Sequence, residues 1–264
     1  MKNYKVAFIL VLTLILCFSG CSQNKTTSED TQKEVQKEVT EKADTMYELK
    51  TETFKDKDVI INYPQLINLS DISTQEKIND MIKTQAFLVY DEIAKQGEPF
   101  SYELNYDVKY SSPELLSIRF NDYINFTQSA HPSNSVETLN IDIKNQKVIK
   151  LIDLVNINEG FVALFKNQIY LSPYPDQTPE LLESIKNILN ETDTKGWIDL
   201  LKNADSFDIY SGNQYSYLTK DSLVIVISVP HFMGDYAEFE INYKDLSEYK
   251  KTDNDIWKVL DSGK

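Results

Sequence analysis

The two histidines are the residues of this sequence best suited to acid–base or metal chemistry, because imidazole titrates near neutral pH and is the commonest metal ligand. His131 lies in Ser129-Ala-His-Pro132, and His231 lies in Pro230-His-Phe-Met-Gly-Asp235. A metal site would need both histidines with Asp235 as a third ligand. The histidines are one hundred positions apart, and the sequence contains no H-x-x-x-H or H-x-E element. We therefore expect no metal, and favour a structural role in which each histidine caps or hydrogen-bonds within its own turn.

Each histidine adjoins a proline next to a predicted strand, which places both on loops. Loops on a rigid sheet scaffold are where binding residues concentrate. We therefore assign the binding region to these two loops. Its residues are Ser129, His131, Pro132, His231, Phe232, Met233, Asp235 and Tyr236.

Other common catalytic arrangements are missing from the sequence. The seven glycines are isolated, so neither a phosphate-binding loop nor a nucleophile elbow is encoded, and no cofactor is expected. The chain has two cysteines, Cys17 and Cys21, and both precede the predicted folded region. Paired carboxylates for sugar hydrolysis stay open as an alternative, because 41 acidic residues are available and none is singled out.

The first twenty residues have the organisation of a signal peptide. Lys2 and Lys5 precede a 13-residue apolar run at 6–18, which is short for a membrane span. The run ends in Phe18-Ser-Gly-Cys21, the pattern of a bacterial lipobox. We therefore expect lipidation at Cys21 and an extracytoplasmic protein held at the outer face of the membrane. A plain secretory signal and a retained anchor are the alternatives.

The charge of the chain restricts its partners. Residues 1–20 hold two lysines and no acidic residue, so 25 basic and 41 acidic residues remain after cleavage, a formal charge of −16. Nucleic acid is excluded as a partner, because its binding needs a positive face. An acidic module attracts basic partners and raises their association rate.

Hydrophobic periodicity predicts an α+β fold, with antiparallel sheets, helices packed on one face and two subdomains. The first half should contain a strand at 58–63 stopped by Pro64, a helix at 73–96 begun by a capping box at Ser73 and Glu76, and strands at 100–110, 116–120 and 139–143. The second half should contain helices at 160–170, 179–189 and 197–204 and strands at 207–210, 215–218, 223–229 and 236–241. The run at 223–229 is continuously apolar and should be buried on both faces.

These elements predict the following organisation along the chain. It comprises a lipoprotein signal peptide at 1–20, a lipidated cysteine and flexible linker at 21–46, an N-terminal α+β subdomain at 47–145, a C-terminal α+β subdomain at 146–250 and a tail at 251–264.

Three stretches resemble the extracellular domain of the RsiV family, which contains the anti-sigma-V factor whose ectodomain senses lysozyme. They are Ser129-Ala-His-Pro132 followed by Thr138-Leu-Asn-Ile-Asp-Ile143, the turn Lys147-Val-Ile-Lys-Leu-Ile-Asp-Leu154, and the run from Tyr217 to Ile241. The same module is similar to the non-catalytic N-terminal region of a peptidoglycan deacetylase. The resemblance covers about residues 47–250.

The resemblance implies a sensor or binding module without catalytic activity. An anti-sigma factor needs a cytoplasmic segment before its membrane helix, whereas here only residues 1–5 precede the apolar run. We therefore expect a non-enzymatic surface lipoprotein that binds a ligand at the cell wall. The expected partner is a basic protein such as lysozyme, or a cell-wall glycan such as peptidoglycan. The alternative is a cell-wall hydrolase or a deacetylase-associated module with an unrecognised carboxylate site.

Overall fold

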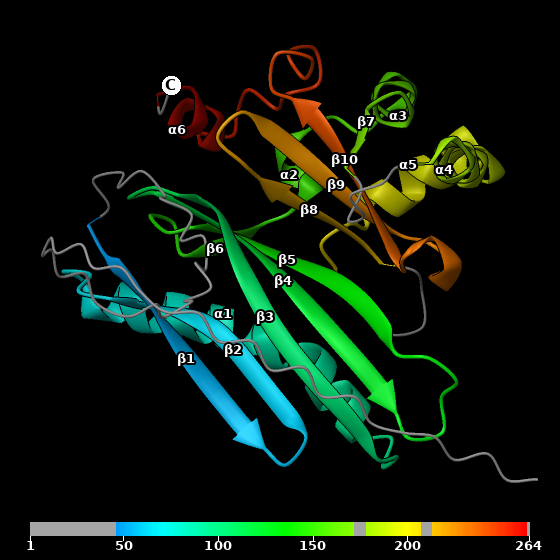
Figure 1. The fold of residues 1–264 in the computed structure, drawn as a ribbon. Helices are drawn as coiled ribbons and strands as arrows, with labels where there is room; N and C mark the ends of the chain where they lie inside the picture. Colours follow the sequence, from blue (N-terminus) through cyan, green and yellow to red (C-terminus); the bar gives the residue numbers. More distant parts are fainter. Residues whose placement is uncertain (1–45, 172–177, 207–212, 263–264) are drawn as a thin grey trace, which may run out of the picture. The chain divides into compact units, whose positions relative to one another are not determined.

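A computed structural model of the chain describes residues 46–171, 178–206 and 213–262. These residues belong to one compact unit, Lys42–Lys264. They form two sheets flanked by helices, which confirms the predicted α+β class (Figure 1). None of the helices in these three ranges has the length and apolar character needed to cross a membrane.

The first sheet has six strands in chain order, with helix α1 (Ile72–Ala94) along one face (Figure 1). The side chains of α1 that recur every three or four residues, from Ile78 to Ile93, are buried against it. The strands are β1 (Glu48–Asp56), β2 (Val59–Ile67), β3 (Phe100–Ser111), β4 (Leu115–Phe126), β5 (Ser133–Asp142) and β6 (Lys147–Ile149). The turn at residues 145–146 joins β5 to β6, and Gln146 has a positive φ of 52°.

One strand pair departs from the predicted antiparallel arrangement. β2 and β3 run parallel, with Ile61 opposite Leu104. The chain reaches β3 through α1, and a parallel pair needs a crossover connection of this kind. The sequence predicted the helix at the right place but not its consequence for the direction of the strand that follows it.

The strand prediction that ended at Pro64 is wrong, because β2 continues to Ile67. Strand β1 pairs with β2 along its whole length, whereas β3 pairs only with Val59–Ile61. Pro64 therefore lies where β2 has a strand partner on one side only. A proline, which lacks the N–H donor, is tolerated at such an edge.

The predicted capping box of α1 is also wrong. The N-cap is Asp71, whose Oδ1 accepts hydrogen bonds from the backbone N–H groups of Ser73 and Thr74, at 3.0 and 3.2 Å. The N-cap therefore lies two residues before Ser73, the predicted one. Aspartate is among the strongest N-cap residues, so it satisfies the first free N–H groups in place of Ser73.

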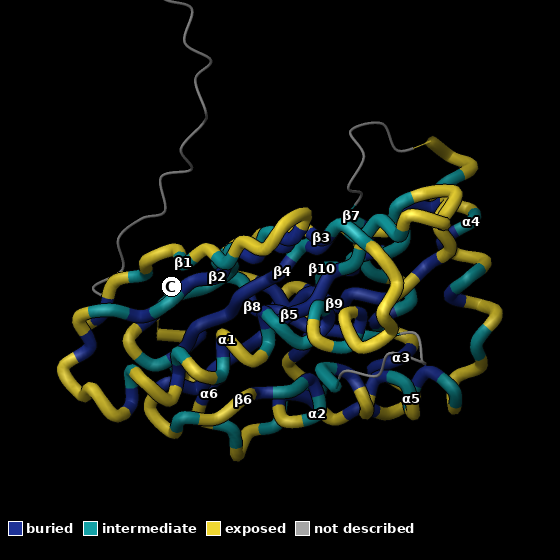
Figure 2. The backbone as a smooth tube through the Cα atoms, turned by 90° about the horizontal axis from the view of Figure 1, so that it is seen from below, coloured by how far each residue is buried: buried dark blue, intermediate teal, exposed yellow. Residues whose placement is uncertain are grey.

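The second sheet has four antiparallel strands in the order β7-β10-β9-β8, with helices on one face. Strand β9 is buried on both faces for six of its seven residues, as its apolar run predicts (Figure 2). The strands are β7 (Ile169–Leu171), β8 (Gln214–Leu218), β9 (Ser222–Ser228) and β10 (Tyr236–Asn242). The helices are α2 (Leu151–Leu154), α3 (Glu159–Lys166), α4 (Pro179–Glu191), α5 (Thr194–Lys202), the short 3₁₀ helix η1 (His231–Met233) and α6 (Ile256–Ser262).

The two sheets pack face to face through polar as well as apolar contacts. Asn140 Nδ2 and Thr138 Oγ1 both donate to the carbonyl of Ser216, at 2.8 and 2.7 Å. Arg119 Nε lies 2.6 Å from Glu238 Oε1 of β10. Strands β4 and β5 are consequently covered by α1 on one side and by the second sheet on the other, and most of their residues are buried.

Two segments differ in detail from the expected organisation. Strand β6 extends the first sheet to Ile149, four residues beyond the boundary proposed at 145. The segment proposed as a tail contains α6, whose Trp257 is 5% exposed and donates from Nε1 to the carbonyl of Leu154 at 3.0 Å. Cys21, the signal peptide and the strand predicted at 207–210 lie outside the described residues.

Candidate functional site

The two histidine loops lie side by side. The rings of His131 and His231 stack with their centroids 5.6 Å apart and their planes 16° from parallel. His131 lies between β4 and β5, whereas His231 begins η1 after β9. Both side chains are exposed, so the paired rings are available to a ligand. The fold thus joins residues that the sequence separates by one hundred positions.

Asp235 connects the two loops. Its Oδ1 lies 2.9 Å from Nδ1 of His231, which places the imidazole proton on Nδ1 as the donor. Its Oδ2 accepts from the backbone N of Asn134 at 2.9 Å and from Nδ2 of Asn134 at 3.3 Å. Asn134 was not predicted from the sequence, where only its position three residues after His131 hints at its role.

The other residues assigned to the binding region differ in their exposure and in their contacts. Phe232 is 80% exposed, the largest exposed fraction among the exposed large apolar residues of the described part. Met233 is 1% exposed and belongs to the core of the second sheet, so it supports the loop from beneath. Ser129 Oγ donates to the carbonyl of His131 and closes that turn, and Pro132 is half-buried beside it.

Tyr236 lies where the binding loop meets the packing between the sheets. The guanidinium carbon of Arg119 lies 5.4 Å from the centroid of the Tyr236 ring.

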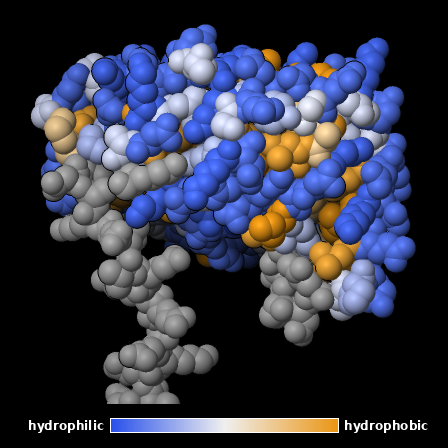
Figure 3. Space-filling model, turned by 90° about the horizontal axis from the view of Figure 1, so that it is seen from above, coloured by the Kyte–Doolittle hydropathy of each residue, from blue (hydrophilic) through white to orange (hydrophobic). Residues whose placement is uncertain are grey.

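Figure 3 shows a largely hydrophilic face on which apolar atoms gather in the half that carries β7, β10 and α4. The exposed apolar residues of that half include Ile169 and Leu182.

A pocket of about 300 Å³ extends from the histidine loops into the molecule. Asp235 and Tyr236 line it on the loop side, and Glu137 and Tyr215 line it further in. Its walls come from the end of α1, from β4 and β5, and from the second sheet. The pocket therefore continues the loop surface as a recess with apolar walls and a carboxyl group.

Two buried carboxyl groups next to this pocket were not found from the sequence. Asp122 on β4 and Glu137 on β5 are each 4% exposed. Burial, together with the neighbouring Asp122, raises the pKa of Glu137 to about 8, and burial raises the pKa of Asp122. Their spacing was an available signal. Glu137 shares the alternation of Leu139, and Asp122 that of Phe120, so both continue the buried face of the strands predicted at 139–143 and 116–120 by two positions.

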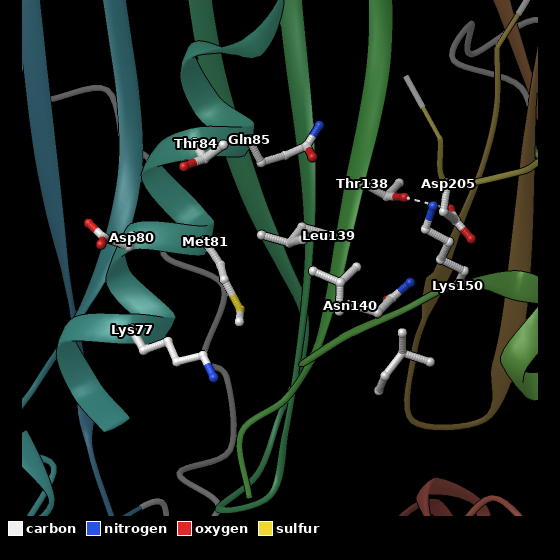
Figure 4. Close-up of a pocket in the computed structure, with 12 residues that line it drawn as sticks. Lys77, Asp80, Met81, Thr84, Gln85, Thr138, Leu139, Asn140, Lys150 and Asp205 are labelled. Carbon is white, nitrogen blue, oxygen red and sulfur yellow. Dashed lines mark hydrogen bonds between the residues drawn. The ribbon is translucent and has the colours of Figure 1, made fainter. Parts of the chain in front are cut away.

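A second pocket, of about 430 Å³, lies between α1 and the edge of the first sheet (Figure 4). Lys77, Met81 and Gln85 of α1 face Thr138 and Asn140 of β5 across it (Figure 4). Gln85 is common to both regions, because its Nε2 donates to Oε2 of Glu137 at 2.7 Å. The contact Gln85–Glu137 therefore separates this second pocket from the first one.

Asp205, which lines the second pocket, has a structural role. Its Oδ1 accepts from the N–H of Ser216 at 2.6 Å, and its Oδ2 accepts from the N–H of Leu151 at 2.7 Å and from Ser216 Oγ at 2.8 Å. Burial raises its pKa to about 6 against the opposing effect of these bonds. The carboxylate is thus engaged in joining β8 to α2. The described ranges contain no group of three or more His, Cys, Asp or Glu side chains suited to a metal ion.

Comparison with known proteins gives one family match. Residues 48–134 match the family model described as "Deacetylase PdaC", which covers a third of the chain. This agrees with the resemblance to a peptidoglycan deacetylase, and the likeness to the RsiV family stays a prediction. No curated protein matches the chain.

Two solved structures resemble the chain at low sequence identity. A DUF3298 family member from Bacteroides fragilis NCTC 9343 is 18% identical, with a TM-score of 0.53, over 82% of this chain and 96% of that one. A DUF3298 family protein from Pseudomonas aeruginosa PAO1 is 15% identical, with a TM-score of 0.44, over 78% of this chain and 93% of that one. The first of these shares the fold with our chain. Residues 48–134 are thus similar to the PdaC family model, and the chain shares its fold with a DUF3298 family structure.

Proposed function

We propose that this chain is an extracytoplasmic binding module of the cell wall that captures a ligand without catalysing a reaction. The ligand is a basic protein such as lysozyme, or peptidoglycan. The observation that carries the proposal is the meeting of the two histidine loops around Asp235, with the exposed Phe232 and a pocket beside them. The family model matched by residues 48–134, named for a deacetylase, supports a place at the wall.

The chemistry of the loops suits recognition by contact. An exposed aromatic ring next to a recess is a common anchor at protein and carbohydrate interfaces. The stacked imidazoles and Asp235 supply donors and acceptors around that ring. The predicted charge of −16 adds attraction for a cationic partner, which speeds association more than it tightens the complex.

The proposed attachment is a lipid on Cys21, followed by a linker up to about residue 46. A flexible chain of this length has a root-mean-square span of roughly 25–30 Å. The folded unit would then sample the wall close to the membrane. Attachment would also raise the effective concentration of the module for any ligand that enters this layer.

We expect the unit comprising residues 42–264 to bind basic lysozyme or purified peptidoglycan, and Phe232→Ala to weaken that binding by about tenfold or more. Calorimetry measures the first interaction and co-sedimentation the second. Ile72→Ala is the matched control. It removes an exposed aliphatic side chain at the start of α1, which lies near Gln146 at the other end of β5. Equal binding by wild type and Phe232→Ala would contradict this site.

A wall hydrolase is the second candidate, favoured by a single observation. Glu137 has a pKa raised to about 8 next to another carboxyl group, an arrangement that suits a general acid. Release of new reducing ends from purified peptidoglycan, lost in Glu137→Gln, would favour this candidate over the first.

A further inference from the structure

Four buried polar atoms with no hydrogen-bond partner in the described part of the chain gather at one place between α1 and the two sheets. They are Asp122 Oδ2, Glu137 Oε1, Tyr102 Oη and Tyr215 Oη. Each of these residues is at most 5% exposed. Buried polar groups without partners are rare in native proteins, and a missing ion or ligand is one of their explanations.

Strand register places these residues next to one another. Asp122 of β4 pairs with Ser135 of β5, two residues before Glu137 on the same face. Asp122 also pairs with Leu104 of β3, two residues after Tyr102 on the same face. Tyr215 comes from β8 of the other sheet. The ionised forms of Asp122 and Glu137 oppose ionisation of both phenols, which requires short distances between them.

Each carboxyl group uses one oxygen and leaves the other without a partner. Asp122 Oδ1 accepts from both the N–H and the Oγ of Ser135, and Glu137 Oε2 accepts from Gln85. No lysine, arginine or histidine of the described residues forms an ion pair with Asp122 or Glu137. Two neighbouring acids without a counter-ion are costly to bury in their ionised forms, so a bound cationic group would stabilise those ionised forms.

The 300 Å³ pocket gives access to this acidic cluster. Glu137 and Tyr215, both with a free oxygen, line it together with Asp235. Aliphatic side chains form much of the remaining wall, among them Val89 of α1, Ile124 of β4 and Val226 of β9. The recess therefore has apolar sides and a region of carboxyl and phenol groups. The apolar sides suit a hydrocarbon chain, and the carboxyl and phenol oxygens suit a cation at the end of that chain.

We propose that the pocket binds an alkylammonium group, such as the side chain of a lysine, with its nitrogen at Glu137 and Tyr215 and its methylene groups along the apolar wall. An ammonium group has three donors and no acceptor, which matches a set of unpartnered carboxyl and phenol oxygens. An anionic ligand would meet two carboxyl groups instead. The inference rests on the proposed binding function and gives the same site its ligand chemistry.

Two sources supply this chemistry at a cell wall. One is a lysine on the surface of a basic protein, and the other is a free amino group on a wall peptide. Both would reach the pocket past His131 and His231, since Asp235 belongs to the loops and to the pocket wall. The shared group is tested first, and the two sources are then compared.

The test is titration of the unit comprising residues 42–264 with Nα-acetyl-lysine amide, followed by amide NMR shifts. We expect saturation at millimolar probe, with shifts clustered at Glu137, Tyr215 and Val226. The uncharged analogue Nα-acetyl-norleucine amide should give no saturation. Glu137→Gln keeps an acceptor for Gln85 and should weaken lysine-probe binding by at least about tenfold, whereas Glu98→Gln, at an exposed site, should not.

The same variants separate failure of the pocket from failure of the proposed function. Absence of saturation at about 50 mM probe, or equal binding by wild type and Glu137→Gln, overturns the alkylammonium site. If lysozyme or peptidoglycan still binds in that case, the proposed function stands without this pocket. Where lysozyme or peptidoglycan binds the wild type, the Glu137→Gln variant distinguishes the two sources. Loss of lysozyme binding in this variant identifies a protein lysine as the occupant, and loss of peptidoglycan binding identifies a wall amine.

Discussion

Glu137→Gln should raise the melting temperature of the protein by about 6 °C or more at pH 8 and change it little near pH 4.5. The expected effect follows from the pKa of Glu137, which is raised from 4.5 to about 8 by burial and by Asp122. Thermal unfolding followed by circular dichroism at a series of pH values measures it. The glutamine keeps an oxygen acceptor for Gln85 but carries no charge.

The direction of this effect comes from proton linkage. Between pH 4.5 and 8 the folded protein holds a proton on Glu137 that the unfolded chain has lost. The free energy of unfolding of the wild type therefore falls as pH rises through this range, by roughly 1.4 kcal/mol for each unit of pKa shift, or on the order of 3–5 kcal/mol in total. The groups that face Glu137 are Asp122, Tyr102 and Tyr215, with neutral Gln85 from α1.

Glu98→Gln is the control for this experiment, because Glu98 is exposed at the loop before β3. It should leave the pH dependence of the melting temperature unchanged. A Glu137→Gln protein that is less stable than the wild type at both pH values would contradict the description of Glu137 as an uncompensated buried acid.

Arg119→Ala should lower the free energy of unfolding by about 3–5 kcal/mol, because it leaves Glu238 without its buried partner. Arg119 Nε and Glu238 Oε1 are 2.6 Å apart, and their side chains are 9% and 12% exposed. The pair joins β4 to β10, and so connects the two sheets. Urea unfolding of the variant measures the loss.

A double-mutant cycle keeps this prediction informative if Arg119→Ala folds poorly. Glu238→Gln removes the charge of the partner, and the combination should be less damaging than the sum of the two changes. Lys50→Ala, which breaks the exposed pair with Glu52, is the control and should leave the free energy of unfolding nearly unchanged. Additive effects of Arg119→Ala and Glu238→Gln would show that the two side chains do not interact.

The sequence predicted most elements of the fold, because their signals are local. The alternation at 100–110 and the apolar run at 223–229 identify β3 and β9, and the helix predicted at 179–189 corresponds to α4. The parallel pairing of β2 with β3 could not be seen, since it depends on where α1 returns the chain to the sheet. Helix α6 was missed because it is short, and its burial depends on a distant contact between Trp257 and Leu154.

The candidate site was predicted only in part, because some of its signals are local and the rest depends on tertiary packing. Residue type and the flanking prolines singled out His131 and His231, but only the packing of β5 near β10 brings their rings together. Asn134 carries no chemical signal of its own. Asp122 and Glu137 had one, since each is a polar residue two positions beyond a predicted strand, where it continues that strand's apolar face. Such conflicts between local pattern and global fold often mark functional positions.

The proposed binding site combines an exposed surface with a recess. The histidine loops offer exposed aromatic and polar groups, and the pocket behind them ends at acids that lack a counter-ion. A basic ligand would satisfy both regions. Its attraction to the acidic protein would act at long range, whereas burial of an amino group in the pocket would act at short range and resist screening by salt.

The most direct test of the proposed function is calorimetry of residues 42–264 with a basic lysozyme at about 0.05 M and about 0.5 M salt. We expect a dissociation constant of about 1 μM or lower at low salt that rises by tenfold or more at high salt. No heat of binding at either salt concentration would contradict the claim that this module captures a basic protein. Peptidoglycan would then be the ligand that the proposal still requires.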